Sequence, residues 1–195
     1  MLQESLELAG IRLHGFTAPS AVSRLRDVPY LGTDDALGEF APGDVLLVNG
    51  VGSTGIPTAR AAAYDRAVAS GYTFARVVDP SAVVRPSVVL GDGVQVLPGA
   101  VIGTDAVVGA NTIVNTRASI DHGSVVGEHC HIAPGATLAG DVRIGDRTHV
   151  GLGAAVIQGI SVGSQCVVGA GAVIVRDVAD GSLAVGVPAS ARPIA

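Results

Sequence analysis

Five histidines are the side chains of this sequence best suited to proton transfer or metal binding: His14, His122, His129, His131 and His149. Imidazole changes its charge near neutral pH, so it serves as a general base or as a metal ligand. A zinc site requires three or four converging ligands. The alternation of His129 with His131 and the 18-residue spacing of His131 and His149 do not supply that number, so we expect no metal site.

A glycine-rich segment, Gly50–Gly55 (GVGSTG), indicates a second kind of chemistry. It satisfies the spacing G-x-G-x-x-G between an expected strand and an expected helix, where backbone N–H groups and a helix N-terminus can hold a phosphate. Two interpretations stay open, a plain glycine turn or a contact with a nucleotide diphosphate through Gly52. A complete dinucleotide-binding fold is excluded, because about 80 residues cannot supply its usual six-stranded sheet.

Hexapeptides repeat through the second half of the chain, sixteen of them in unbroken succession from Ala82 to Asp177. The third residue of every hexapeptide, from Val84 to Ile174, is valine, isoleucine or leucine. A fixed short period means that each repeat buries its apolar side chain against the repeats stacked above and below it. Six residues do not fit helical spacing, so the pattern predicts a strand and a turn per repeat, wound as a parallel β-helix.

Glycine often follows the inward aliphatic residue of a hexapeptide. We expect these glycines to adopt positive φ, which tight corners favour. They are Gly91, Gly103, Gly109, Gly127, Gly145, Gly151, Gly163 and Gly169.

The composition narrows the possible functions. A net charge of −5 argues against a nucleic-acid partner. The mean hydropathy of +0.50 does not indicate membrane insertion, because charges or glycines interrupt every apolar run before the roughly 18 residues that a spanning helix needs. No signal peptide opens the chain, so we expect a cytoplasmic protein. Aromatic residues make up 3% of the chain, which suits a stacked core of valine, isoleucine and alanine.

The N-terminal part of the chain, up to Pro80, contains no hexapeptides, and short apolar runs alternate there with helical stretches. The expected elements are a helix at Leu2–Ala9, strands at Ile11–Phe16 and Asp44–Asn49 (the latter buried), a helix at Pro57–Ser70 and a strand at Tyr72–Val78. The chain is therefore expected to be mainly β, with a small, truncated α/β Rossmann-like domain at residues 1–80. Asp79-Pro80 would join it to a β-helix domain at residues 81–195.

The order of these domains, the hexapeptides and the C-terminal segment resemble the PglD/NeuD family of bacterial sugar acetyltransferases, which are hexapeptide-repeat acyltransferases. The most specific stretch is Asn115–His122 (NTRASIDH), followed by Val126–Glu128 (VGE) and His131–Gly135 (HIAPG). The segment Gly186–Ala189 (GVPA) matches the closing loop of the family. The resemblance covers nearly the whole chain and implies a left-handed β-helix with three hexapeptides per coil.

Family members transfer an acetyl group from acetyl-CoA to an amine or hydroxyl of a sugar, often a nucleotide-linked 4-amino-4,6-dideoxy sugar. They are usually homotrimers with active sites between subunits. The resemblance therefore implies acetyl-CoA as donor, an amino-sugar acceptor, a homotrimer, no metal, and His122 as general base. We expect Gly52 and Asn115 to contact the acceptor. Transfer to a sugar hydroxyl stays open as an alternative.

The resemblance places the acetyl-CoA contacts at His131, Leu152 and Ala170. These residues fall in the ninth, twelfth and fifteenth hexapeptides, hence on one face of a three-sided prism. His122 falls in the seventh, on another face, so donor and base would meet at an edge or across a subunit boundary. For Leu152 and Ala170, ordinary corner packing is the alternative.

The cysteines, Cys130 and Cys166, are each the first residue of a hexapeptide. With three hexapeptides per coil they stand two coils apart, on the order of 10 Å at the usual strand spacing. A disulfide requires Cα atoms within about 7 Å. We therefore expect two free thiols, as is usual in the cytoplasm.

Two features depart from the family pattern. Members open with a strand and a G-x-x-G-H-A loop that holds the nucleotide sugar, whereas this chain begins at the helix that follows, so we expect both to be missing. The residue after the catalytic histidine is commonly acidic, but here it is Gly123. Asp121 and Glu128 are candidates to replace that acid, although strand alternation turns Asp121 away.

Two other functional classes stay open. A non-catalytic β-helix scaffold would explain both departures. A γ-class carbonic anhydrase shares the β-helix and binds zinc through three histidines, two of them five residues apart. Here the residues five before and five after His122 are Arg117 and Gly127, which argues against it.

Overall fold

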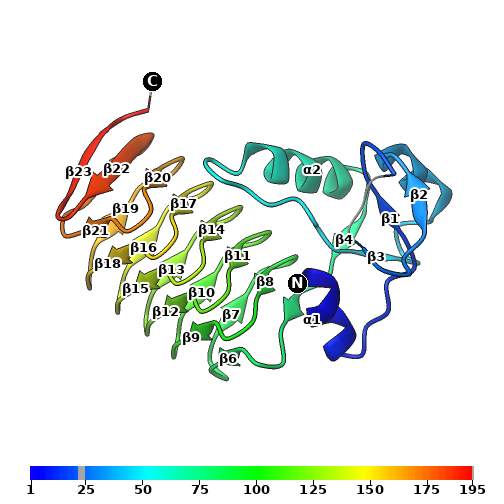
Figure 1. Cartoon of the computed structure of the whole chain (residues 1–195), viewed down its shortest axis with the longest axis horizontal. Coiled ribbons are helices and arrows are strands. Elements are labelled where there is room, and N and C mark those ends of the chain that lie inside the picture. The colour runs from blue at the N-terminus through cyan, green and yellow to red at the C-terminus, as the bar shows by residue number, and fades with distance from the viewer. Residues whose placement is uncertain (22–24, 195) are drawn as a thin grey trace.

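The computed structural model describes residues 1–21 and 25–194, and Figure 1 shows two parts. One is a three-sided stack of short parallel strands, and the other is a module of helices and short strands at the N-terminal end of that stack. The stack is a left-handed β-helix, which confirms the predicted fold. No helix among the described residues is long and apolar enough to cross a membrane.

Three parallel sheets form the sides of the β-helix. The first contains β6 (Val83–Val84), β9 (Val101–Ile102), β12 (Ser119–Ile120), β15 (Thr137–Leu138), β18 (Ala155–Val156) and β21 (Val173–Ile174). The second contains β7 (Val89–Leu90), β10 (Val107–Val108), β13 (Val125–Val126), β16 (Arg143–Ile144) and β19 (Ser161–Val162). The third contains β5 (Val77–Val78), β8 (Gln95–Val96), β11 (Ile113–Val114), β14 (His131–Ile132), β17 (His149–Val150), β20 (Val167–Val168), β22 (Ser182–Gly186) and β23 (Ala189–Pro193), the last of which is antiparallel to β22.

Each strand of the repeat is the second and third residue of a hexapeptide, and it pairs with the equivalent strand of the next coil. In β12 and β15, for example, Ser119 pairs with Thr137 and Ile120 with Leu138. The third residue points inward, and from Val96 to Ile174 it is at most 3% exposed at every repeat. The predicted column of aliphatic residues is therefore the core, and only Val84 and Leu90 in the first repeats are partly exposed.

The glycines that follow the inward aliphatics do not adopt positive φ, so that expectation was wrong. Positive φ occurs at the last residue of the hexapeptide, as in Gly123 (66°) and Asp141 (60°). The earlier glycine is needed because the next coil passes close by. A Cβ on Gly91 would lie 2.6 Å from the backbone nitrogen of Ala110.

Hydroxyl and thiol groups at the first hexapeptide position connect neighbouring coils. The Cys130 N–H donates to Oγ1 of Thr112 (2.9 Å), and its thiol donates to the carbonyl of Gly145 (3.1 Å). Cys166 is likewise a free, buried thiol, which confirms the absence of a disulfide between the two. Burial raises the pKa of the Cys130 thiol to about 12, so it is a structural group and a poor nucleophile.

In its described residues, 1–21 and 25–76, the N-terminal module contains two helices, a 3₁₀ helix and two small parallel sheets. In chain order these elements are α1 (Leu2–Leu8), β1 (Phe16–Thr17), β2 (Tyr30–Gly32), η1 (Asp34–Glu39), β3 (Leu46–Leu47), α2 (Thr58–Ala69) and β4 (Thr73–Phe74). β1 pairs with β2, and β3 with β4. Both predicted helices are confirmed.

The predicted strands of this module were too long. Ile11–Phe16 contributes only its last residue to β1, and Asp44–Asn49 shortens to β3, whose Leu46 is 68% exposed and not buried. Tyr72–Val78 divides into β4 and β5, because β5 pairs with β8 in the β-helix. The first β-helix strand thus lies before the division that the sequence suggests between residues 80 and 81.

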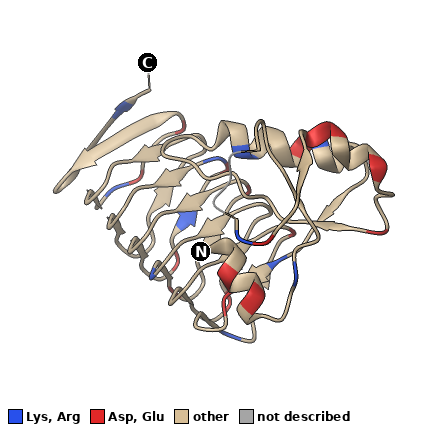
Figure 2. Ribbon diagram, turned by 45° about the vertical axis from the view of Figure 1, so that its right-hand side comes forward, with Lys and Arg blue, Asp and Glu red and all other residues tan. Residues whose placement is uncertain are grey.

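The joint between the two parts is packed. The buried carboxylate of Asp79 accepts hydrogen bonds from the hydroxyls of Ser5 on α1 and Ser81, both at 2.6 Å. These bonds, with that from Ser5 the largest, lower the pKa of Asp79. Figure 2 shows that acidic residues lie on α1, while the strands of the β-helix carry few charges.

Candidate active site

His122 lies in the exposed turn that follows β12. Its backbone N–H donates to Oδ1 of Asp121 (2.7 Å), so this carboxylate oxygen is already engaged within the turn. Its ring lies against Gly140 on the next coil: a Cβ there would be 2.5 Å from Cε1 and 2.6 Å from Nε2. The ring is therefore open to solvent and supported from one side, as a base that meets an incoming substrate must be.

A second group of polar residues lies on the neighbouring sheet, around His131 in β14. The hydroxyl of Ser53 is 2.8 Å from Nδ1 of His131, and the amide Nδ2 of Asn115 is 2.9 Å from Nε2. Since the amide donates, Nε2 accepts and Nδ1–H is left to donate to Ser53. This network joins Ser53 of the glycine-rich segment to Asn115 through the His131 ring.

The His131 ring itself is 6% exposed, and both of its nitrogens are engaged. Burial, and secondarily His149 and Arg60, lower the pKa of His131 to about 4, so the ring is neutral at physiological pH. His149 packs edge-on against it with ring centroids 5.0 Å apart, as the 18-residue spacing suggested. A neutral, fully hydrogen-bonded ring is suited to hold Ser53 and Asn115 in place.

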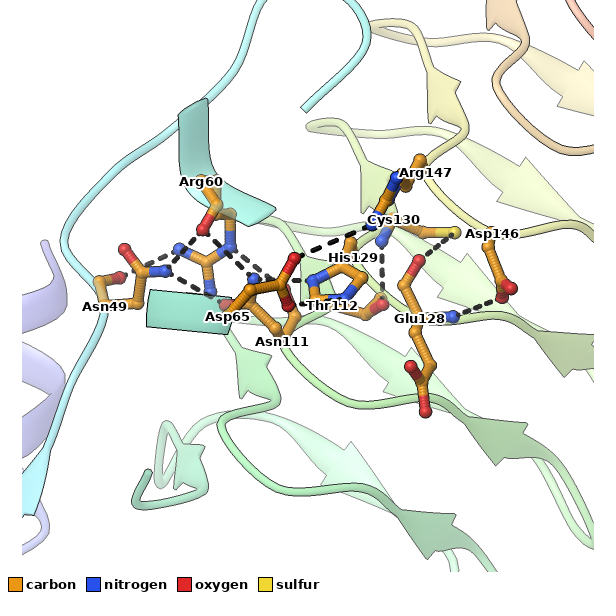
Figure 3. Close-up of polar contacts among 10 residues, drawn as sticks. All are labelled: Asn49, Arg60, Asp65, Asn111, Thr112, Glu128, His129, Cys130, Asp146 and Arg147. Atoms are coloured by element: carbon orange, nitrogen blue, oxygen red, sulfur yellow. Dashed lines mark hydrogen bonds and ion pairs between the residues drawn. The ribbon is translucent and has the colours of Figure 1, made fainter. Parts of the chain in front are cut away.

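The glycine-rich segment is held to the β-helix by a residue that sequence analysis missed, Arg60 of α2. Its Nη1 donates to the carbonyls of Asn49 (2.8 Å) and Val51 (2.7 Å), and its Nε donates to the carbonyl of Asn111 (2.9 Å). Gln95 on β8 also donates to the Asn49 carbonyl (2.7 Å). In Figure 3 the Arg60 guanidinium lies between Asn49 and Asn111.

Arg60 is fully buried, and among the described residues no carboxylate pairs with it. Burial lowers the pKa of Arg60 to about 10, which leaves it charged at neutral pH. Little in the sequence indicates that Arg60 is buried and holds the glycine-rich segment, because an arginine in a helix of mixed composition is ordinarily exposed. Gln95 occupies the outward second position of its hexapeptide, where polar residues are common, so its residue type does not indicate a contact with the distant glycine-rich segment.

Further polar contacts connect α2 to the turn that contains His129. The His129 ring receives Nδ2 of Asn111 at Nδ1 (3.0 Å) and lies 3.5 Å from the Asp65 carboxylate through Nε2. Asp65 also lies 3.6 Å from Arg147 (Figure 3). Burial, as the largest effect, lowers the pKa of His129. These contacts fix the side of α2 that faces the β-helix.

Leu152 and Ala170 lie in consecutive turns after β17 and β20, and both are exposed. These strands belong to the same sheet as β14, so the structure brings His131, Leu152 and Ala170 onto one face. His122 follows β12, which belongs to another sheet. A single chain therefore presents the expected base and the expected cofactor residues on different sides. No three His, Cys, Asp or Glu side chains converge on a metal site within 1–21 and 25–194.

Comparison with known proteins is consistent with this geometry. Residues 105–140 match the family described as bacterial transferase hexapeptide (six repeats), and residues 141–176 match the hexapeptide repeat of succinyl-transferase. No curated protein sequence matches the chain.

Solved structures match over almost the whole length. A histidine-to-asparagine mutant of perosamine N-acetyltransferase from Caulobacter crescentus, in complex with CoA and GDP-perosamine, is 36% identical with a TM-score of 0.92, covering 99% of this chain and 91% of that one. The acetyltransferase domain of PglB from Neisseria gonorrhoeae, in complex with acetyl coenzyme A, is 33% identical with a TM-score of 0.88, covering 97% and 92%.

Proposed function

Because this chain belongs to the hexapeptide-repeat family of sugar acetyltransferases, we propose that it acetylates the amino group of a nucleotide-linked amino-dideoxy sugar. The chain is an acetyltransferase, and acetyl-CoA is its donor. The observation that carries the proposal is the 36% identity, over 99% of the chain, to an N-acetyltransferase solved with CoA and GDP-perosamine. We place the reaction in the cytoplasm, where the two free thiols are stable.

In the proposed reaction His122 acts as general base. The ammonium form of an amino sugar releases its extra proton to water before it can react, and an exposed imidazole can accept the next proton, which the attacking nitrogen loses as the neutral amine adds to the thioester carbonyl. The new C–N bond forms as the C–S bond breaks. The proton held by His122 then passes to the CoA thiolate, which restores the neutral ring.

The proposed cofactor site is the exposed turn column at Leu152 and Ala170, and the acceptor lies near Gly52 and Asn115. The sheet that presents these turns is the one on which Ser53, Asn115 and His131 are joined by hydrogen bonds. His131 supports the site through Ser53 and Asn115, because both of its ring nitrogens are already engaged.

A bulky side chain on this path should exclude the cofactor. Ala170→Trp is expected to weaken CoA binding at least tenfold, because the exposed turn residue points away from the core. Glu128→Trp, an exposed residue at the same hexapeptide position on another edge, is the matched control. Calorimetry with CoA measures both. Equal affinity for the two variants would show that the cofactor lies elsewhere.

A homotrimer completes this site in the proposal. Outward valines in the first coils are exposed, with Val89 at 59% and Val83 at 46%, and such apolar columns favour burial against a second copy. In a closed trimer the His122 turn of one protomer can face the Leu152 and Ala170 turns of its neighbour. Light scattering coupled to gel filtration measures the assembly, and a monomeric mass would contradict it.

The direct test of the proposed function is an acceptor assay. The protein is incubated with acetyl-CoA and either GDP-perosamine or the sugar nucleotide with a hydroxyl in place of the amine. We expect free CoA thiol and a singly acetylated product only with the amine. Reaction with the hydroxyl compound alone would indicate an O-acetyltransferase. Tight acetyl-CoA binding without product from either compound would indicate a scaffold protein.

A further inference from the structure

Two stacked turns place His122 and Asp141 across the same narrow gap. His122 and Gly123 follow β12, and Gly140 and Asp141 follow β15, the next strand of the same sheet. The backbone N–H of Asp141 donates to the carbonyl of His122 (2.9 Å), which fixes the stacking of the two turns. In the first turn the histidine precedes the glycine, and in the second turn the glycine precedes the aspartate.

The side chains of His122 and Asp141 cross this gap in opposite directions. The His122 ring reaches the neighbouring coil at Gly140, where a Cβ would lie 2.5 Å from Cε1. The Asp141 carboxylate reaches back to Gly123, where a Cβ would overlap Oδ1. Consecutive Cα atoms are about 3.8 Å apart, so the ring and the carboxylate occupy neighbouring spaces, each left open by a glycine, without a direct ion pair between them among those of the described residues.

We propose that Asp141 is the acidic positioning residue of His122, supplied from the following coil. This inference rests on the proposed function. A carboxylate beside an imidazole orients the ring and stabilises the cation that forms when the base accepts a proton. Gly123 cannot supply such a group, and a side chain at that position would displace the carboxylate of Asp141.

The other acids near His122 are engaged or directed elsewhere. Asp121 uses Oδ1 to accept the backbone N–H of His122 (2.7 Å). Asp105 occupies the position equivalent to Gly123 on the preceding coil, and its backbone N–H donates to Oγ of Ser87 (2.9 Å). The carboxylate of Asp105 is not among the atoms nearest to Gly123. Glu128 follows β13, which belongs to a different sheet, so it does not supply the acid.

The backbone permits an exchange of the two residues. Gly123 has φ of 66° and Asp141 has φ of 60°, so both positions are left-handed. Glycine adopts this conformation freely, and aspartate is among the side chains that tolerate it. The double variant Gly123→Asp with Asp141→Gly therefore returns a carboxylate to the residue after the histidine without new strain in the turns.

The test compares four proteins: the parent, Asp141→Asn, the exchanged double variant and the control Asp105→Asn. Asp141→Asn should lower kcat by roughly 10- to 10³-fold with the KM for acetyl-CoA unchanged. This is below the roughly 10⁴-fold effect of a buried triad aspartate, because Asp141 is exposed and screened by water. The exchanged variant should recover most of the lost kcat, and Asp105→Asn, which removes an equal charge, should stay within about twofold of the parent.

A kcat for Asp141→Asn equal to that of the parent, or equal losses in Asp141→Asn and Asp105→Asn, would overturn the proposal. A second readout separates it from the proposed function. Ring-nitrogen NMR shifts of His122 report its tautomer without turnover, and we expect one dominant tautomer in the parent and a mixture in Asp141→Asn. If no acceptor is acetylated, the proposed function fails, and an unchanged tautomer in Asp141→Asn would then overturn the role of Asp141 as well.

Discussion

In the β-helix, two-residue strands are held by columns of buried aliphatic side chains that repeat once per coil. In the N-terminal module, strands of similar length depend on polar contacts to a neighbour: Arg60, Asn49 and Gln95 join the glycine-rich segment to the β-helix, and Ser5 joins α1 to Asp79. Among the described residues of the module, the apolar cluster has three buried members, Ala67, Tyr72 and Phe74. The repeat therefore holds its own shape, whereas the module takes its shape from the surface on which it packs.

The greatest loss in the free energy of unfolding is expected for a substitution in the β-helix core. Leu138→Ala removes a side chain with no exposed surface and should lower the free energy of unfolding by roughly 2–5 kcal/mol through lost burial and a cavity. Thr137→Ala, on the outward side of the same strand, should change it by less than about 0.5 kcal/mol. Urea unfolding at fixed protein concentration measures both. Equal losses would mean that inward and outward positions are not distinguished as described.

A smaller and more local loss of stability is expected when Arg60 of the module is replaced. Arg60→Met leaves the buried carbonyl of Asn111 without its donor and removes one donor each from the carbonyls of Asn49 and Val51, at about 1–3 kcal/mol for an unsatisfied buried group. Hydrogen exchange should quicken in α2 and its neighbours while the β-helix strands stay protected. The control is Arg66→Met on the same helix, whose arginine is exposed and forms only a surface ion pair. Equal loss of protection in the β-helix would contradict the division into two differently stabilised regions.

At the junction of the two regions we expect stability to depend on pH through His131. The pKa of His131 is lowered to about 4 in the folded protein and returns to about 6.5 on unfolding. Its contribution to stability is complete above pH 6.5 and is lost as the pH falls from 6.5 toward 4, because only the unfolded chain takes up the proton. At pH 5 the loss is about 2 kcal/mol. His131→Gln should flatten the decline, and parallel curves for the two proteins would rule out this contribution.

Much of the β-helix could be predicted, because one inward aliphatic per hexapeptide determines strand, register and core together. The module could not be predicted as well, since β1 to β4 are too short to show an alternation and Arg60 is buried by contacts with residues far away in sequence. Of the candidate site, the turn of His122 and the common face of His131, Leu152 and Ala170 followed from the repeat. The link between Ser53 and His131 did not, because it joins the two regions through 78 residues of chain.

Asp141 had a signal that the repeat itself provides. Positions 105, 123 and 141 are equivalent on successive coils and carry aspartate, glycine and aspartate. The missing acid at Gly123 therefore has an acidic neighbour at the equivalent position of the next coil. The direction of the Asp141 side chain depends on the geometry of the turn, which the sequence pattern alone does not determine.

Single-turnover kinetics of His122→Asn test whether His122 performs the proton transfer of acetylation. The variant is mixed as a preformed acetyl-CoA complex with saturating amino-sugar nucleotide, and acetyl-CoA affinity is measured on the same sample. Because the ring is exposed and outside the core, we predict a chemical step slower by roughly 10²–10⁴-fold, with acetyl-CoA affinity and melting temperature unchanged. A chemical step as fast as that of the parent protein would show that His122 is not the general base.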